Sequence, residues 1–143
     1  MDFKPVLGWH NHLQRGDRAE LRRAHRPLEL AVAHGFHDLR SALPEVDLQR
    51  VGQIARVLSF VDSHQNSSFP KALKSVMSEA RLRRLVESDR DQLTQHLINA
   101  IKLLKGKANV VDVAEIIYWW GDRRAQQLAY DYFGSSEGAD DES

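Results

Sequence analysis

Apolar residues recur every three or four positions along most of this chain, and that spacing places them on one face of an α-helix. In the N-terminal half the pattern predicts helices over residues 5–14, 17–25, 27–43 and 47–64. Gly16 is expected to end the first helix. Asp17 is expected to cap the second, with Glu20 three residues later completing a capping box.

The same period continues after the connector "SHQNSSFPKALKS", in which Pro70 is expected to begin a short helix. The stretch "SEARLRRLVES" predicts another helix, and a longer one begins at Asp89 or Asp91. Two more are predicted, "VAEIIYWW" capped by Asp112 and a last helix capped by Asp122.

These elements predict an all-α protein built as compact helical bundles, because there is no β-alternation, internal repeat or heptad run. A length of 143 residues suits one helical domain over 1–133, made of two packed sub-bundles at about 1–66 and 67–133. Residues 134–143 contain four acidic and no basic residues and are expected to form an acidic disordered tail.

Composition supports a globular chain, with 42% hydrophobic and 28% charged residues. There is no cysteine, which excludes disulfides and thiolate metal sites and is consistent with a reducing cytoplasm. The N-terminus lacks the features of a signal peptide, and no apolar run is long enough to cross a bilayer. We therefore expect a cytoplasmic protein without membrane contact.

The formal net charge of zero conceals a segregation of charge along the chain. Without the tail, 20 basic residues face 16 acidic ones, and residues 71–107 contain nine basic residues against four acidic ones. A basic face is therefore possible on a protein that is neutral overall.

Two short motifs have simpler structural interpretations. The "RGD" at 15–17 is an integrin-recognition tripeptide, but Asp17 is better explained as a helix cap. The "HNH" at 10–12 suggests a nuclease, yet His10 and His12 are two positions apart and do not share a helix face. Without HExxH spacing we predict no metal site, and a small metal-dependent nuclease stays a rival hypothesis.

The sequence offers no convergent catalytic pair. Glu115 and Asp122 lie near "YWWGDRR", but no P-loop, GxSxG or glycine-rich phosphate loop accompanies them. We predict no enzymatic activity and no cofactor. In the same block Trp120 is expected to be buried, which leaves Trp119 or Tyr118 nearer the surface or a partner.

Two rows of arginines carry the strongest functional signal. On the second helix Arg18, Arg22 and Arg23 are expected to project outward together, and so are Arg81 and Arg84 on a later helix. The positive charges within each row repel one another unless an anion binds between them. The planar guanidinium group of arginine matches the geometry of a phosphate group. Contact with a nucleic-acid backbone, without reading of bases, is the predicted role, and an ordinary solvated face is the alternative.

Four segments together resemble a known family. They are "GWHNHLQRGDRAELRRA", "SSFPKAL", "ARLRRLVESDRDQL" and "VVDVAEIIYWWGDRRAQQLAYDYF", in this order and spacing. They are similar to the CasB family, the small subunit of the type I-E CRISPR surveillance complex Cascade. Pro70 stands where that family usually has glycine, and "HLINAIKLL" has no arginine where some members have one.

The resemblance implies a non-catalytic, all-helical subunit of two bundles. It also implies two copies head to tail beside other Cascade subunits, with a basic face along the crRNA and target DNA that stabilises the R-loop. Together with the arginine rows, it predicts these nucleic-acid-binding residues: Arg18, Arg22, Arg23, Lys71, Lys74, Arg81, Arg83, Arg84, Lys102, Lys105, Arg123 and Arg124.

The alternative function is a helical adaptor that binds only protein, through Trp119 and its neighbours. For the acidic tail, a solubilising role competes with masking of the basic face before assembly.

Overall fold

The computed structural model describes the backbone of residues 1–141 and the side chains of residues 1–134. The regular secondary structure of this part of the chain is helical apart from two two-residue strands, which confirms the predicted all-α class. The first half contains α1 Pro5–His12, α2 Arg15–Arg23, α3 Pro27–Ala31, α4 His34–Ala42, α5 Leu48–Leu58 and β1 Ser63–His64. The second contains α6 Phe69–Leu73, α7 Glu79–Val86, α8 Arg90–Leu103, β2 Lys107–Ala108, α9 Val110–Trp119 and α10 Asp122–Asp141.

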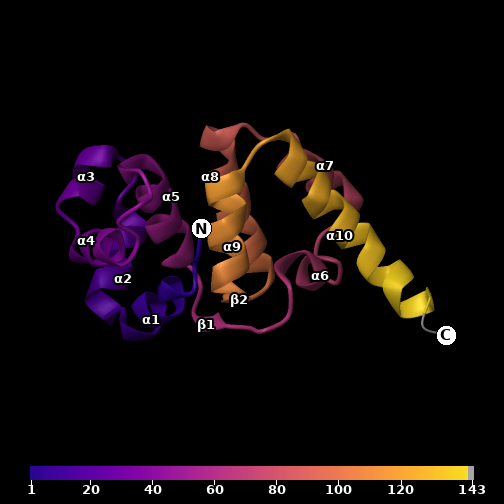
Figure 1. The fold of residues 1–143 in the computed structure, drawn as a ribbon, viewed down its shortest axis with the longest axis horizontal. Helices are drawn as coiled ribbons and strands as arrows, with labels where there is room; N and C mark the ends of the chain where they lie inside the picture. Colours follow the sequence, from indigo (N-terminus) through magenta and orange to yellow (C-terminus); the bar gives the residue numbers. More distant parts are fainter. Residues whose placement is uncertain (142–143) are drawn as a thin grey trace.

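The two halves of the chain lie side by side along the longest axis of the molecule (Figure 1). Helix α5 packs against both α8 and α9, and α1 also packs against α9, so one hydrophobic core runs through both halves. Phe3 extends this junction, with its ring centroid 5.2 Å from that of Tyr118. Helix α10 packs on α6 and α7 and then projects from the body.

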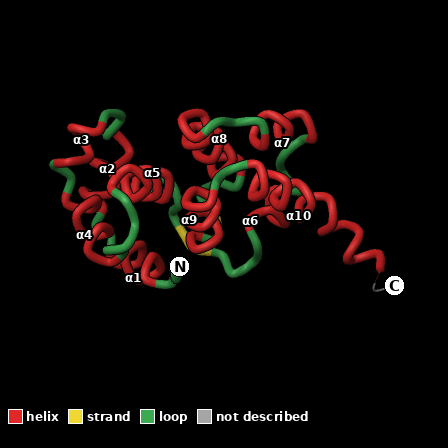
Figure 2. The backbone as a smooth tube through the Cα atoms, turned by 45° about the horizontal axis from the view of Figure 1, so that its top comes forward, coloured by secondary structure: helices red, strands yellow, loops and turns green. Residues whose placement is uncertain are grey.

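The two strands form a short parallel pair, with Ser63 opposite Lys107 and His64 opposite Ala108 (Figure 2). Gly106 precedes β2 in the left-handed region (φ 78°), and its carbonyl oxygen accepts from the backbone N–H of Asp62 at 2.8 Å. An ideal Cβ at Gly106 would lie 2.4 Å from Asp62 Oδ2, so glycine is required at this turn.

Helix starts that were predicted from capping residues are partly confirmed. The Asp89 side chain caps α8, as one of the two predicted starts required, and forms a capping box with Gln92. The Asp47 side chain caps α5, a cap that was not predicted from the sequence. The predictions for Gly16 and Asp17 are wrong, because α2 already begins at Arg15 and contains both residues. Both predictions assumed that glycine must interrupt the helix.

The predicted cap at Asp112 is also wrong. Asn109 caps α9, and Asp112 instead accepts a hydrogen bond from the Phe69 backbone N–H at 2.9 Å. This carboxylate therefore satisfies an unpaired donor at the start of α6, which is a tertiary contact that local spacing does not reveal. Pro70 lies within the first turn of α6, after Phe69.

The single helix predicted over 27–43 is divided into α3 and α4 at an extended Ala33. The break lets Gly35 approach α1 and α2 closely. An added Cβ there would lie 2.8 Å from Leu21 Cδ1, and Trp9 Nε1 donates to the Gly35 carbonyl at 2.9 Å. A continuous helix could not provide this packing.

Two further expectations concern the C-terminal region. Trp119 is exposed (51%), as one of the predicted alternatives required, whereas Trp120 is half-buried rather than buried and donates from Nε1 to the Ser88 carbonyl at 2.9 Å. The backbone of 134–141 continues α10, while its side chains from 135 on and residues 142–143 lie outside the described part. The disordered tail stays a prediction.

Candidate nucleic-acid interface

The arginines of α2 do not all project freely into solvent, contrary to the prediction from helical spacing. Arg18 Nη1 donates to the Ser59 carbonyl oxygen at 3.3 Å and also to the carbonyl of Val61. Arg22 Nε donates to the same Ser59 oxygen at 2.8 Å, and its Nη2 contacts Asp62 Oδ1 at 3.0 Å. These two arginines therefore also hold the turn after α5.

The outer edges of these side chains still line one shallow groove of about 470 Å³, together with Asp62. We call its basic members the α2 cluster: Arg15, Arg18, Arg22 and Arg23. Burial lowers the pKa of Arg18, and repulsion from Arg22 lowers it further, but an arginine stays protonated at neutral pH. Arg23 is exposed on this surface.

Phe60 connects the α2 cluster to the other half of the molecule. Its half-buried ring lies 5.3 Å from the Arg22 guanidinium carbon, 5.9 Å from that of Arg56 and 5.4 Å from Lys102 Nζ. These cations come from α2, α5 and α8. The negative face of an aromatic ring attracts each of them and so offsets part of their mutual repulsion.

Lys102 is also part of a groove between α7 and α8 with a volume of about 370 Å³. We call this the α7–α8 groove; it is lined by Met77, Arg81, Arg84, Leu85, His96, Asn99, Ala100, Lys102 and Leu103. Arg81 and Arg84 project together, as predicted, and both are exposed. Within the described residues neither they nor Lys102 form an ion pair.

Shared residues link the α2 cluster, the cations around Phe60 and the α7–α8 groove, and we call the three parts together the basic track. Arg22 belongs to the first two parts and Lys102 to the last two, so each part shares a residue with the next. Asp62 is the one carboxylate among the described residues that line the two grooves. The track therefore concentrates positive charge on a protein without net charge.

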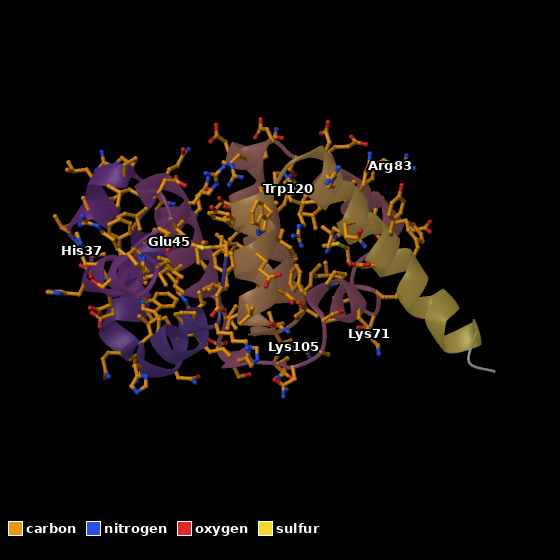
Figure 3. All side chains as sticks on the ribbon, in the orientation of Figure 1. His37, Glu45, Lys71, Arg83, Lys105 and Trp120 are labelled. Carbon is orange, nitrogen blue, oxygen red and sulfur yellow. The ribbon has the colours of Figure 1, made fainter. Side chains whose placement is uncertain are left out.

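The other predicted basic residues do not line the two grooves of the track, and several have other partners. Lys71 and Lys105 lie along one edge of the molecule and Arg83 on the opposite edge (Figure 3). Arg83 shares a groove with Glu79 and Glu87. Lys74 Nζ lies 4.7 Å from the centroid of the Tyr132 ring. Arg124 lines a groove with Asp112 and Glu115, and Arg123 is exposed. Their role in binding stays a prediction.

The two histidines of the HNH motif point to different partners. His10 is buried and donates from Nε2 to the Val61 carbonyl at 2.7 Å, an acceptor that it shares with Arg18. His12 is exposed and its Nδ1 lies 2.8 Å from the Gly8 carbonyl. Burial lowers the pKa of His10, and the charge of Arg18 adds to this effect. No group of three potential metal ligands occurs in the part of the chain that the structure describes.

Sequence reasoning missed five residues of the track: Arg15, Arg56, Phe60, His96 and Asn99. Arg56 and Phe60 flank the end of the apolar helix α5, where they contribute nothing to a row of charges. Only the packing of α5 between α2 and α8 brings them to the surface next to other cations. A search for basic residues near the ends of apolar helices could have identified Arg56 but not Phe60.

The fold and this track define an all-helical protein with a cationic surface that spans its two halves. A family model described as "CRISPR-associated protein Cse2" matches residues 17–133, and the chain belongs to this family, which confirms the predicted relationship. No curated protein sequence is significantly similar to the chain.

Solved structures share the fold at low sequence identity. One is a chain of the crystal structure of E. coli Cascade bound to a PAM-containing double-stranded DNA target, with a TM-score of 0.74 and 23% identity over 94% of this chain and 95% of that one. Another is CasB from Thermus thermophilus, with a TM-score of 0.70 and 23% identity over 90% and 95% of the two chains. Among the described residues of our chain, no helix has both the length and the hydrophobicity needed to cross a bilayer.

Proposed function

We propose that this chain is a non-catalytic subunit of a Cascade surveillance complex, and that its basic track contacts the phosphates of crRNA and target DNA. The observation that carries the proposal is the set of shared residues that links the track from Arg23 to Arg81 across both halves of the fold. Membership of the Cse2 family and the likeness to a chain of DNA-bound Cascade support it.

The mechanism follows from charge without base recognition. Exposed guanidinium and ammonium groups bind phosphates of any sequence and release counterions, so they add affinity but no sequence choice. Exchange of a DNA duplex for an RNA–DNA heteroduplex is nearly balanced in energy, as known from another RNA-guided system. A few backbone contacts along the track are therefore sufficient to stabilise the R-loop. In the complex the chain would lie beside other Cascade subunits and a second copy of itself.

The α7–α8 groove provides the cleanest test, because its cations do not hold a backbone turn as Arg18 and Arg22 do. Arg22→Ala would also remove the hydrogen bond that holds Ser59, whereas Arg81, Arg84 and Lys102 are exposed and lack ion pairs within the described chain. We expect the triple alanine variant to weaken binding to single-stranded DNA. The dependence of log K on log salt should flatten by roughly 0.7 to 0.9 for each phosphate that the variant no longer neutralises.

The matched control is Arg26→Ala, which also removes a positive charge. Arg26 is exposed but already paired with Glu29 at 3.3 Å, outside the basic track. Its affinity and salt slope should equal those of the wild-type chain in a fluorescence anisotropy titration. Equal salt slopes for the triple variant and the wild type would refute the assignment of the track.

One observation favours the alternative, an adaptor that binds only protein. Trp119 is exposed at the end of α9, and tryptophan is enriched at the centres of protein interfaces. That function predicts no affinity of the isolated chain for single-stranded nucleic acid, even at low salt, so the same titration separates the two proposals.

A further inference from the structure

The α7–α8 groove differs from the rest of the basic track because it has an apolar floor. Met77, Leu85 and Ala100 are buried beneath it, while Arg81 and Arg84 stand on one rim and Lys102 on the other. Contact with phosphate alone requires only exposed cations, as along the outer side of α2. An apolar floor between basic rims matches a ligand that joins a planar apolar group to an anion.

The size of the groove fits such a ligand. Its volume of about 370 Å³ lies within the range of roughly 300–1,000 Å³ that is typical of small-molecule sites. A duplex would not use this feature, because its bases are stacked inside and only sugars and phosphates reach the protein. An unpaired base, in contrast, removes its faces from water when it enters such a groove.

The α8 wall of the groove supplies two uncharged polar side chains, His96 and Asn99. Asn99 Oδ1 accepts a hydrogen bond from Gln95 Nε2 at 3.0 Å, which fixes the amide and leaves its Nδ2 hydrogens directed elsewhere. His96 lies one turn before Asn99 on α8 and is half-buried in the same wall. Donors and acceptors of this kind bind the exposed edges of unpaired bases.

We propose that the α7–α8 groove binds one unpaired nucleobase of the strand whose phosphates lie on the basic track. The base would rest on the apolar floor beside His96 and Asn99, and its flanking phosphates would contact Arg84 and Lys102. This inference rests on the proposed function, and it adds a preference for unpaired strands over duplex that phosphate contacts alone would not give.

The test compares three labelled nucleic acids with the full chain: oligodeoxythymidine, an abasic strand of the same length and charge, and a duplex. We expect the base-containing strand to bind roughly tenfold more tightly than the abasic strand, because a base that rests on the apolar floor removes apolar surface from water. The His96→Ala/Asn99→Ala double variant should reduce this preference and keep the salt slope, because it removes no permanent charge.

Photocrosslinking gives a second readout that does not depend on any variant. A strand with 4-thiothymidine should crosslink to peptides from α7 and α8. Equal affinity for the base-containing and abasic strands, or crosslinks only outside α7 and α8, would overturn the base site while the salt-dependent binding of the track remained. If none of the three nucleic acids bound in a salt-dependent manner, the proposed function itself would fail.

Discussion

Arg90 joins the two halves of the molecule at the point where α9 ends, and its replacement tests how the fold is held together. The half-buried guanidinium donates from Nη1 to the Ile117 carbonyl at 2.7 Å and to Gln53 Oε1 at 3.1 Å. Its Nη2 donates to the Trp120 carbonyl at 3.3 Å. A single side chain thus satisfies the open end of α9 and links it to α5.

The magnitude follows from these contacts. Each hydrogen bond from a charged donor contributes about 1.5–3 kcal/mol, and Arg90→Met leaves the carbonyls of Ile117 and Trp120 without this partner. Two effects reduce the sum. Water can reach part of the site, and Arg90 is the first residue of α8, where a positive charge costs about 0.3–1 kcal/mol at the helix N-terminus. We expect a net loss of about 2–3 kcal/mol, or a decrease in Tm of roughly 10 °C for a chain of this size.

Thermal unfolding followed by circular dichroism measures this decrease. Arg90→Lys keeps the charge but not the planar fork, so about half of the loss is expected. The matched control is Arg123→Met at an exposed position, which should change the free energy of unfolding by less than about 0.5 kcal/mol. A Tm for Arg90→Met equal to that of the control would show that Arg90 does not stabilise the junction.

Two other predictions concern the turn at Gly106 and the buried His10. Gly106→Ala places a Cβ 2.4 Å from Asp62 Oδ2 at positive φ and should lower the free energy of unfolding in urea by about 2 kcal/mol. Gly134→Ala, with open space around it, is the control and should be neutral or slightly stabilising. Equal urea midpoints for the two variants would contradict this. The pKa of His10 is lowered in the fold, so the histidine of the unfolded chain is protonated first as the pH falls below about 6.5. The free energy of unfolding should therefore decrease by up to about 1.4 kcal/mol per pH unit until the pKa of the folded state is reached. His10→Gln should flatten this slope below about pH 6.5, and an unchanged slope would assign it to another group.

Local sequence signals succeeded where a helix is governed by its own residues. The apolar stripe of α5 and the Asp89 cap of α8 depend on contacts within a few positions, so spacing was sufficient to predict them. The failures at Asp17 and Asp112 have the opposite origin. Gly16 lies inside α2 because tertiary packing stabilises that helix. Asp112 could cap its own helix α9, but it accepts a hydrogen bond at the start of α6, forty-three residues away in the chain.

The arginine rows show the same division within the candidate site. Helical spacing alone placed Arg81 and Arg84 on one surface, and the structure brings them to one groove. Spacing could not show that Arg18 and Arg22 bind carbonyls of the turn after α5, because those carbonyls are about forty residues away in the chain.

Residue type and local spacing were sufficient to predict the helical class, the family and a surplus of basic residues over acidic ones before residue 134. Which of these charges come together on one surface depends on the tertiary structure. Packing of α5 between α2 and α8 brings Arg22, Arg56 and Lys102 around Phe60 and leaves Arg83 on the opposite edge of the molecule from Lys71 and Lys105. The direction of a side chain in space depends on how whole helices pack, and the local pattern of the chain does not contain that information.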